Sequence, residues 1–188
     1  MSLRNEFRSL YAHLRKLHDA LTGLRVTVVE DRPLSGGSVV LLDAFGDAAE
    51  DMIGWVEEGL ASARPAAESP GGRAFDVGGA LQALVSCQDL FNKVSGRLAF
   101  DLISYERVGE LMRLGRERRG EWRAWAGSVK EALDGCQQQL YDTNQALFRC
   151  WQEIAERVGM TSVSVQATNI GQQVTVPTHK EQLFEEVT

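Results

Sequence analysis

The sequence predicts a mainly α protein: an antiparallel four-helix bundle with a long helical hairpin and a small appended β element. In most of the 188-residue chain, apolar residues recur every three or four positions, as on the buried face of a helix. The stretch 76–159 contains no proline, so long helices can form there. Residues 161–177 instead alternate apolar and polar side chains with period two, which is typical of strands.

Composition excludes two broad classes of protein. With 44% hydrophobic and 24% charged residues, the chain can build a core, and wholesale disorder is not expected. No run of about 18 apolar residues occurs, so we expect no membrane span. Charges in the first eight residues argue against a signal peptide. Three widely spaced cysteines do not make a disulfide framework and suit a reducing compartment, so we expect a cytoplasmic protein.

The first helix is expected over about residues 2–22. Gly23 is a natural helix stop, and residues 24–29 are rich in β-branched side chains, which predicts a short strand or extended crossing. Spacings of four and three residues define one apolar stripe, formed by Leu3, Phe7, Leu10, Leu14, Leu17 and Leu21.

A second helix is expected over about residues 38–63, with Ser38 as its N-cap. The alternative is that residues 38–42 form a buried strand and a hairpin with residues 24–29. Residues 61–75 contain two of the four prolines and a glycine pair, so they are expected to form a flexible linker.

The long hairpin is predicted to pair a helix over 76–115 with a helix over 120–158. The apolar stripe of the first of these helices is formed by Val77, Leu81, Leu84, Phe91, Val94, Leu98, Leu102, Tyr105 and Met112. The turn is placed at 115–120, where glycines bracket charged residues. A stripe from Trp122 through Trp125 to Ile154 supports one continuous second arm, although Asp134-Gly135 is a turn signal inside it. Each arm would be about 60 Å long, at 1.5 Å per residue. Such arms outreach the first two helices, so Trp122, Trp125 and Leu114 are expected to stay partly uncovered in a monomer.

The C-terminal segment has no charged residue between positions 158 and 178. We therefore expect two domains: a helical bundle over 1–160, and residues 161–188, a β-hairpin-like segment with an acidic tail. An uncharged hairpin is unstable alone, so it must fold back on the bundle or add to a neighbour's sheet edge. The sequence leaves both possibilities open. The apolar side chains that would make this contact are Val163, Val165, Ile170, Val174 and Val176.

Two charged patches are candidate partner-binding surfaces. Residues 107–123 hold six arginines against three glutamates, a local charge of +3, while residues 43–58 hold six acids and no base, a local charge of −6. These opposed patches could meet within one molecule or between molecules. The basic candidates are Arg113, Arg116, Arg118, Arg119 and Arg123, with Trp122 beside them, and the acidic candidates are Asp43, Asp47, Glu50 and Asp51.

No pattern indicates catalysis, a metal ion or a cofactor. His13 and His18 are five residues apart, which does not place two imidazoles on one helix face. Cys136 and Cys150 are about 21 Å apart along a helix, and the sequence around Cys87 offers no base to activate its thiol. A helical enzyme whose site assembles from distant residues is the least favoured function.

These observations favour a non-enzymatic assembly or adaptor subunit in the cytoplasm. It would bind a protein partner or a like subunit through helix faces, the charged patches and the C-terminal β segment. The alternative is a nucleic-acid-associated subunit of a larger complex, which would use the arginine-rich hairpin tip. Arginines beside an exposed aromatic could grip a phosphate backbone, although the overall charge of −6 weighs against it.

Overall fold

The computed structural model describes residues 2–33, 40–71, 74–158, 168–169 and 174–175, and it is mainly helical as predicted. Two short strands pair antiparallel, with Thr168 opposite Thr175 and Asn169 opposite Val174. The elements in chain order are α1 (Leu3–Val29), α2 (Val40–Ala67), α3 (Val77–Arg97), the π-helical turn η1 (Leu98–Leu102), α4 (Tyr105–Arg118), α5 (Glu121–Val158), β1 (Thr168–Asn169) and β2 (Val174–Thr175).

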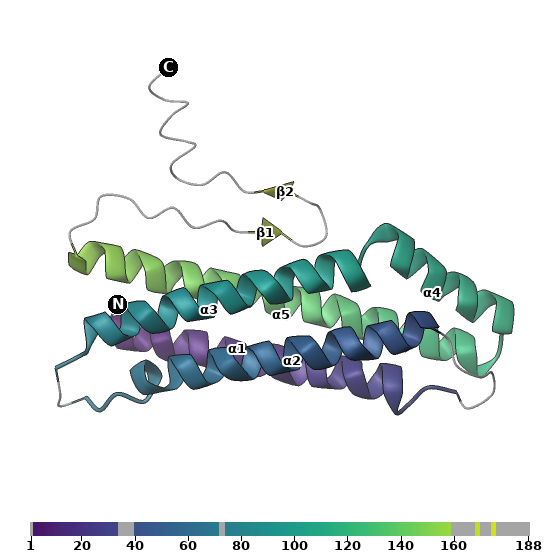
Figure 1. Ribbon diagram of the computed structural model, residues 1–188, viewed down its shortest axis with the longest axis horizontal. Coiled ribbons are helices and arrows are strands. Elements are labelled where there is room, and N and C mark those ends of the chain that lie inside the picture. Colours follow the sequence, from purple (N-terminus) through teal and green to yellow (C-terminus); the bar gives the residue numbers. More distant parts are fainter. Residues whose placement is uncertain (1, 34–39, 72–73, 159–167, 170–173, 176–188) are drawn as a thin grey trace, which may run out of the picture.

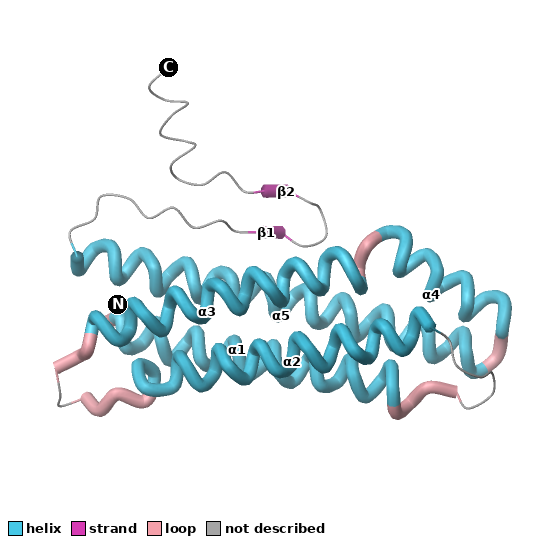
Figure 2. Tube along the Cα trace, viewed as in Figure 1, coloured by secondary structure: helices cyan, strands magenta, loops and turns pink. Residues whose placement is uncertain are grey.

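Four long helices lie side by side and alternate in direction (Figure 1). Helix α1 packs against α2 and α5, α2 packs against α3, and α3 packs against α5, so the four close around one core. The fifth helix, α4, lies at the far end of the bundle from the N-terminus and packs on the first part of α5. The described loops fall at the two ends of the bundle (Figure 2). None of the described helices combines the length and apolar character that a membrane crossing requires.

Helix α1 continues through the segment that was expected to be a strand. Residues 24–29 are helical, so the predicted β element there is wrong, and so is a hairpin with residues 38–42. Leu24 and Val28 extend the four-three spacing of the apolar stripe and are buried in the core. Burial of these side chains outweighs the β-propensity of the segment. Gly23 does not stop the helix, because a glycine inside a helix costs only about 1 kcal/mol.

Helix α2 also runs further than predicted, so the expected linker 61–75 is helical over its first seven residues. Pro65 lies within the last turn of the helix, so the backbone N–H that proline lacks removes a hydrogen bond only near the helix end. The buried side chains of Ala63, Ala66 and Ala67 pack into the core, and the Nε of Arg8 donates a hydrogen bond to the carbonyl of Ala67 at 3.2 Å. These contacts hold the helix together beyond the proline.

The predicted helix over 76–115 is broken. Helix α3 ends at Arg97, the chain passes through η1, and Ser104 starts α4 as its N-cap, with its Oγ accepting the N–H of Arg107 at 3.3 Å. The assumed apolar stripe is therefore partly wrong: Leu81 and Tyr105 are exposed, while Leu84, Leu98 and Leu102 are buried.

The second arm is confirmed as one continuous helix, α5, which passes through Asp134-Gly135 without a break. The expectation that its first part stays uncovered is wrong. Trp122 is 3% exposed and Trp125 is 6% exposed, because α4 folds over this part of α5 and α1 reaches it from the other side. The Nε1 of Trp125 donates a hydrogen bond to the carbonyl of Thr27, near the end of α1, at 2.7 Å.

Candidate functional site

The predicted arginine tip forms at the turn between α4 and α5. Arg119 and Gly120 both adopt positive φ angles, 58° and 53°, and so reverse the chain within two residues. Around this turn the arginines at positions 113, 116, 118, 119 and 123 are all exposed. The structure therefore brings the sequence-predicted basic residues to one end of the bundle.

The aromatic residues of this tip are not available for stacking on bases. The rings of Trp122 and Trp125 pack edge to face in the core, with centroids 5.5 Å apart. The guanidinium of Arg118 lies over the Trp122 ring, 4.6 Å from its centroid, and covers it from outside. The expectation of an exposed aromatic beside the arginines is wrong for both tryptophans, because packing of α4 on α5 buries them.

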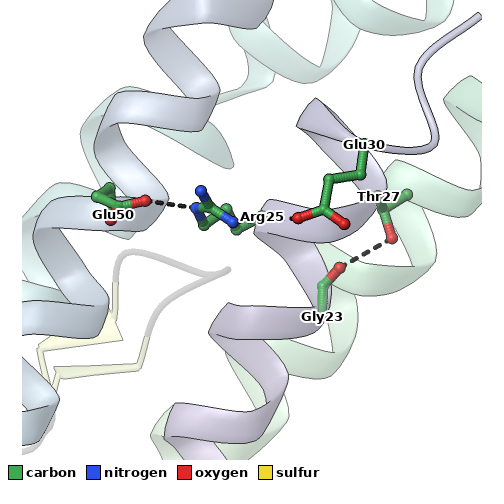
Figure 3. A network of polar contacts seen from close by, with 5 residues as sticks. All are labelled: Gly23, Arg25, Thr27, Glu30 and Glu50. Carbon is green, nitrogen blue, oxygen red and sulfur yellow. Dashed lines mark hydrogen bonds and ion pairs between the residues drawn. The ribbon is translucent and has the colours of Figure 1, made fainter.

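Three acidic residues of α2 pair with arginines that lie outside the tip. Glu50 bonds to Arg25 of α1, which also pairs with Glu30 at 3.3 Å (Figure 3). Hydrogen bonding to Glu50 raises the pKa of Arg25. Asp43 pairs with Arg32 at 3.0 Å, and Asp51 pairs with Arg97 of α3 at 3.0 Å.

The acidic patch thus serves mainly to join α2 to its neighbours. The arginines that pair with these three acids come from α1, from the loop after α1 and from α3. Contact between the acidic patch and the arginine tip, within one molecule or between two, stays a prediction. Asp47 lies exposed on the same helix and lines a groove of about 590 Å³ beside Arg25 and Arg32.

Among the residues that the structure describes, the most exposed aromatic side chains lie at the break between α3 and α4. Phe100, in η1, is 76% exposed, and Tyr105, the first residue of α4, is 97% exposed. A π-helical turn inserts an extra residue and so rotates the side chains that follow relative to an α-helix. Arg97 and Asp101 bridge the turn with an ion pair of 2.7 Å.

Sequence reasoning missed this pair of aromatics. Tyr105 was placed on the buried stripe because its position fits a continuous helix, and Phe100 had no role. The available signal was Ser104 followed by Glu106 in the first turn, a combination typical of a helix N-terminus. The exposure of the two rings follows from the break, because in an unbroken helix the side chains after η1 would point in other directions.

One side of α4 packs on α5 and the other faces outward. Leu111 and Gly115 are the buried residues of α4, and a Cβ at Gly115 would lie 2.8 Å from the Cβ of Ala126. Among the described elements, α4 makes extensive contacts only with α5 and, at its start, with η1. We call the opposite side the α4 outer face; its exposed residues are Tyr105, Glu106, Gly109, Arg113, Arg116 and Glu117.

A polar groove of about 620 Å³ runs between α1 and α2. The Nε of Arg64 donates to the hydroxyl of Tyr11 at 3.3 Å, which raises the pKa of Arg64, and His18 Nε2 lies 3.2 Å from Glu57. These groups are paired with one another across the two helices. The groove is therefore the solvent-facing edge of the contact between α1 and α2.

The thiols are shielded from chemistry in the folded chain. Burial raises the pKa of both Cys87 and Cys136 to about 12, and it raises the pKa of Cys150 as well. A nucleophilic cysteine needs the opposite shift. Within the described ranges, no three His, Cys, Asp or Glu side chains are grouped so as to hold a metal ion.

The C-terminal candidates are mostly not described. Val163, Val165, Ile170 and Val176 lie outside the described residues, and Val174 begins β2. Binding of a partner through this segment, or its return onto the bundle, stays a prediction.

The fold and the exposed surface together define a class: a mainly helical bundle that presents a short, outward-facing helix with aromatic and basic side chains. Comparison with known proteins adds no name to this class, because no protein-family model, no curated protein and no solved structure matches the chain.

Proposed function

We propose that this protein is a non-enzymatic assembly or adaptor subunit of the cytoplasm, which binds another protein through the α4 outer face and the adjoining Phe100. The observation that carries the proposal is the exposure of two aromatic rings, Phe100 and Tyr105, at a helix break at one end of the bundle.

Exposed aromatics of this kind favour binding on energetic grounds. Covering a large apolar side chain such as Phe100 contributes about 1.5–3 kcal/mol. Tyrosine and arginine are the residue types enriched among the side chains that dominate interface energies, and both occur on the α4 outer face. The two rings therefore supply an anchor, and the charged side chains around them supply orientation.

The surface is also held in place before binding. Helix α4 is fixed at its start by the Ser104 cap and along its inner side by the close packing of Gly115 on Ala126. A surface that is already ordered loses little conformational entropy on binding, so more of the contact energy appears as affinity.

The nucleic-acid alternative rests on the exposed arginines of the tip, chiefly Arg116, Arg119 and Arg123. Burial of Trp122 and Trp125 removes the stacking contribution from this alternative, and the overall charge of −6 opposes it. Tight binding of DNA or RNA that weakens steeply with salt would favour it over protein binding.

Site-specific photocrosslinking in the cell that makes the protein tests the proposal. A benzophenone amino acid is placed in the full chain at position 100, at position 105 and, as a control, at position 141, where Tyr141 is also exposed but lies on α5. We expect a discrete protein adduct from positions 100 and 105 and none from position 141. Equal adducts from all three positions, or none from 100 and 105, would contradict the proposal.

A further inference from the structure

We infer that the α4 outer face binds a second copy of this chain, with the two α4 helices antiparallel and crossing at Gly109. The inference rests on the proposed function and names its partner. It is carried by three residues spaced one helical turn apart on the exposed side of α4: Tyr105, Gly109 and Arg113.

The spacing makes the face complementary to itself. Gly109 lies midway between Tyr105 and Arg113, so a two-fold axis through Gly109 places Tyr105 of each copy against Arg113 of the other. In an interface of this symmetry, residue i contacts j while j contacts i, so one good contact is made twice. A guanidinium over a tyrosine ring is an attractive cation–π contact.

Among the described residues, nothing packs against the open side of Gly109. A Cβ at this position would meet nothing within 4 Å, whereas a Cβ at Gly115 would collide with Ala126. Glycine inside a helix is destabilising relative to alanine, so the bundle alone gives no reason for it. At the centre of an exposed helix face, its missing side chain lets a second backbone approach closely.

Charge fixes the orientation of the two helices. The first half of α4 carries Glu106 and Glu110 against Arg107, a local charge of −1, and the second half carries Arg113, Arg116 and Arg118 against Glu117, a local charge of +2. Antiparallel helices bring acidic and basic halves together, whereas parallel helices would oppose like charges. Arg113 is open to such a contact, since its side chain is largely exposed and its ion pair with Glu117 is long, at 3.9 Å.

The same geometry gives Phe100 a place in the interface. Arg116 lies about 10 Å from Gly109 along the helix, at 1.5 Å per residue. In the antiparallel pair it would reach the level of the helix break of the second copy, where Phe100 is exposed beside the Arg97–Asp101 ion pair. The covered surface would therefore include both exposed aromatics of this end of the bundle.

Sedimentation equilibrium on the purified full chain tests the pairing through a mixing experiment. We expect the wild type to form dimers at high micromolar concentration. Tyr105→Arg and Arg113→Glu should each raise the dissociation constant at least tenfold. The first variant places two arginines against each other at both contacts, and the second places a carboxylate against the tyrosine ring at both contacts. An equimolar mixture of the two variants should dimerise again, since the introduced arginine meets the introduced glutamate and the native Tyr105 and Arg113 still meet once.

Substitution of two exposed glycines, Gly109 and Gly135, distinguishes an effect on the interface from an effect on folding. Gly109→Leu should abolish the dimer, because it blocks the approach of the second backbone, and it should raise the thermal midpoint at concentrations where the wild type is monomeric, because it strengthens the helix. Gly135→Leu is the matched control: Gly135 is exposed on α5, a Cβ there also meets nothing within 4 Å, and its substitution should leave the dimer intact.

The outcomes distinguish this inference from the proposed function. A wild-type monomer at high micromolar concentration, or a mixture that does not restore the dimer, overturns the pairing through α4. If positions 100 and 105 then crosslink to a different protein, the proposed function still holds. If the crosslinked species has twice the mass of the chain and disappears in Gly109→Leu, both are supported.

Discussion

Helices α4 and α5 meet in one hairpin, but the surroundings of the two helices differ. Helix α5 spans 38 residues, contacts α1, α3 and α4, and buries residues along its whole length, from Trp122 to Ala155. Helix α4 spans 14 residues, buries only Leu111 and Gly115, and faces outward elsewhere. The comparison shows that α5 is shaped by the core of the bundle, while α4 carries the surface features that the core does not explain.

The two helices should therefore respond differently to loss of a buried leucine, and this is the largest effect we expect. Leu140→Ala in α5 should lower the free energy of unfolding by about 2–5 kcal/mol, because it leaves a cavity in the centre of the core. Urea denaturation measures this loss. Leu111→Ala in α4 is the matched variant; hydrogen exchange should show faster exchange in α4 and unchanged protection in the C-terminal half of α5. Uniform loss of protection would contradict the comparison.

The contact between the two helices should be sensitive to a single methyl group. Gly115→Ala places a Cβ 2.8 Å from the Cβ of Ala126 and 3.2 Å from the carbonyl of Trp122, so it should destabilise the protein by about 1–3 kcal/mol. Gly109→Ala, on the outer side of the same helix, should stabilise the monomer, in dilute solution, by up to about 1 kcal/mol. Thermal or urea denaturation of both variants gives the comparison. A similar loss in both would mean that α4 is enclosed on both sides.

The turn that joins the helices should tolerate glycine at both positions. Arg119 has φ 58° and ψ −173°, a backbone conformation that glycine adopts without strain. Arg119→Gly should therefore raise the free energy of unfolding by about 1 kcal/mol, after the entropy that glycine adds to the unfolded chain. Arg116→Gly, inside the helix, serves as the control and should lower stability. A loss of stability in Arg119→Gly would show that the turn is not strained.

The contact of α5 with α1 should weaken in mild acid, and this effect should be the smallest. Burial lowers the pKa of His13, with Lys16 adding to the shift, while Asp142 and Arg149 of α5 act in opposite directions. The unfolded chain then binds a proton near pH 6.5 that the folded chain binds only at lower pH, so stability falls as pH drops below 6.5. Urea midpoints at pH 7.5 and 5.5 measure the fall.

His13→Gln should make that pH dependence shallower, because glutamine does not titrate. His18→Gln is the control, because His18 lies on the other side of α1, 3.2 Å from Glu57 of α2. If both variants changed the slope equally, His13 would not be the group responsible.

Two of the core helices, α1 and α5, were predictable because their apolar stripes are unambiguous. In α5 the three-four rhythm from Trp122 to Ile154 carries the helix through Asp134-Gly135, as expected. In α1 the same rhythm continues through Leu24 and Val28, and burial of these two side chains overrides the local β-propensity. Burial on a packed face decides helix boundaries more strongly than single glycines, prolines or β-branched residues do.

The candidate site was only half predictable. The arginines gather at the tip because they surround a turn that the sequence marks with two glycines. The acidic patch could not be paired from sequence, since its partners Arg25, Arg32 and Arg97 come from three separate segments. The break at η1 had no proline to reveal it, so the exposure of Phe100 and Tyr105 became visible only in three dimensions.

Because all three cysteines are buried, the rate at which their thiols are labelled reports how often the bundle opens. Cys87, Cys136 and Cys150 sit on α3 and α5, and a thiol reagent can reach them only when those helices separate. A cysteine introduced at position 100 would be exposed and would react at once. In one labelling experiment, the fast phase would then report reaction at the surface, and the slow phase would report opening of the core.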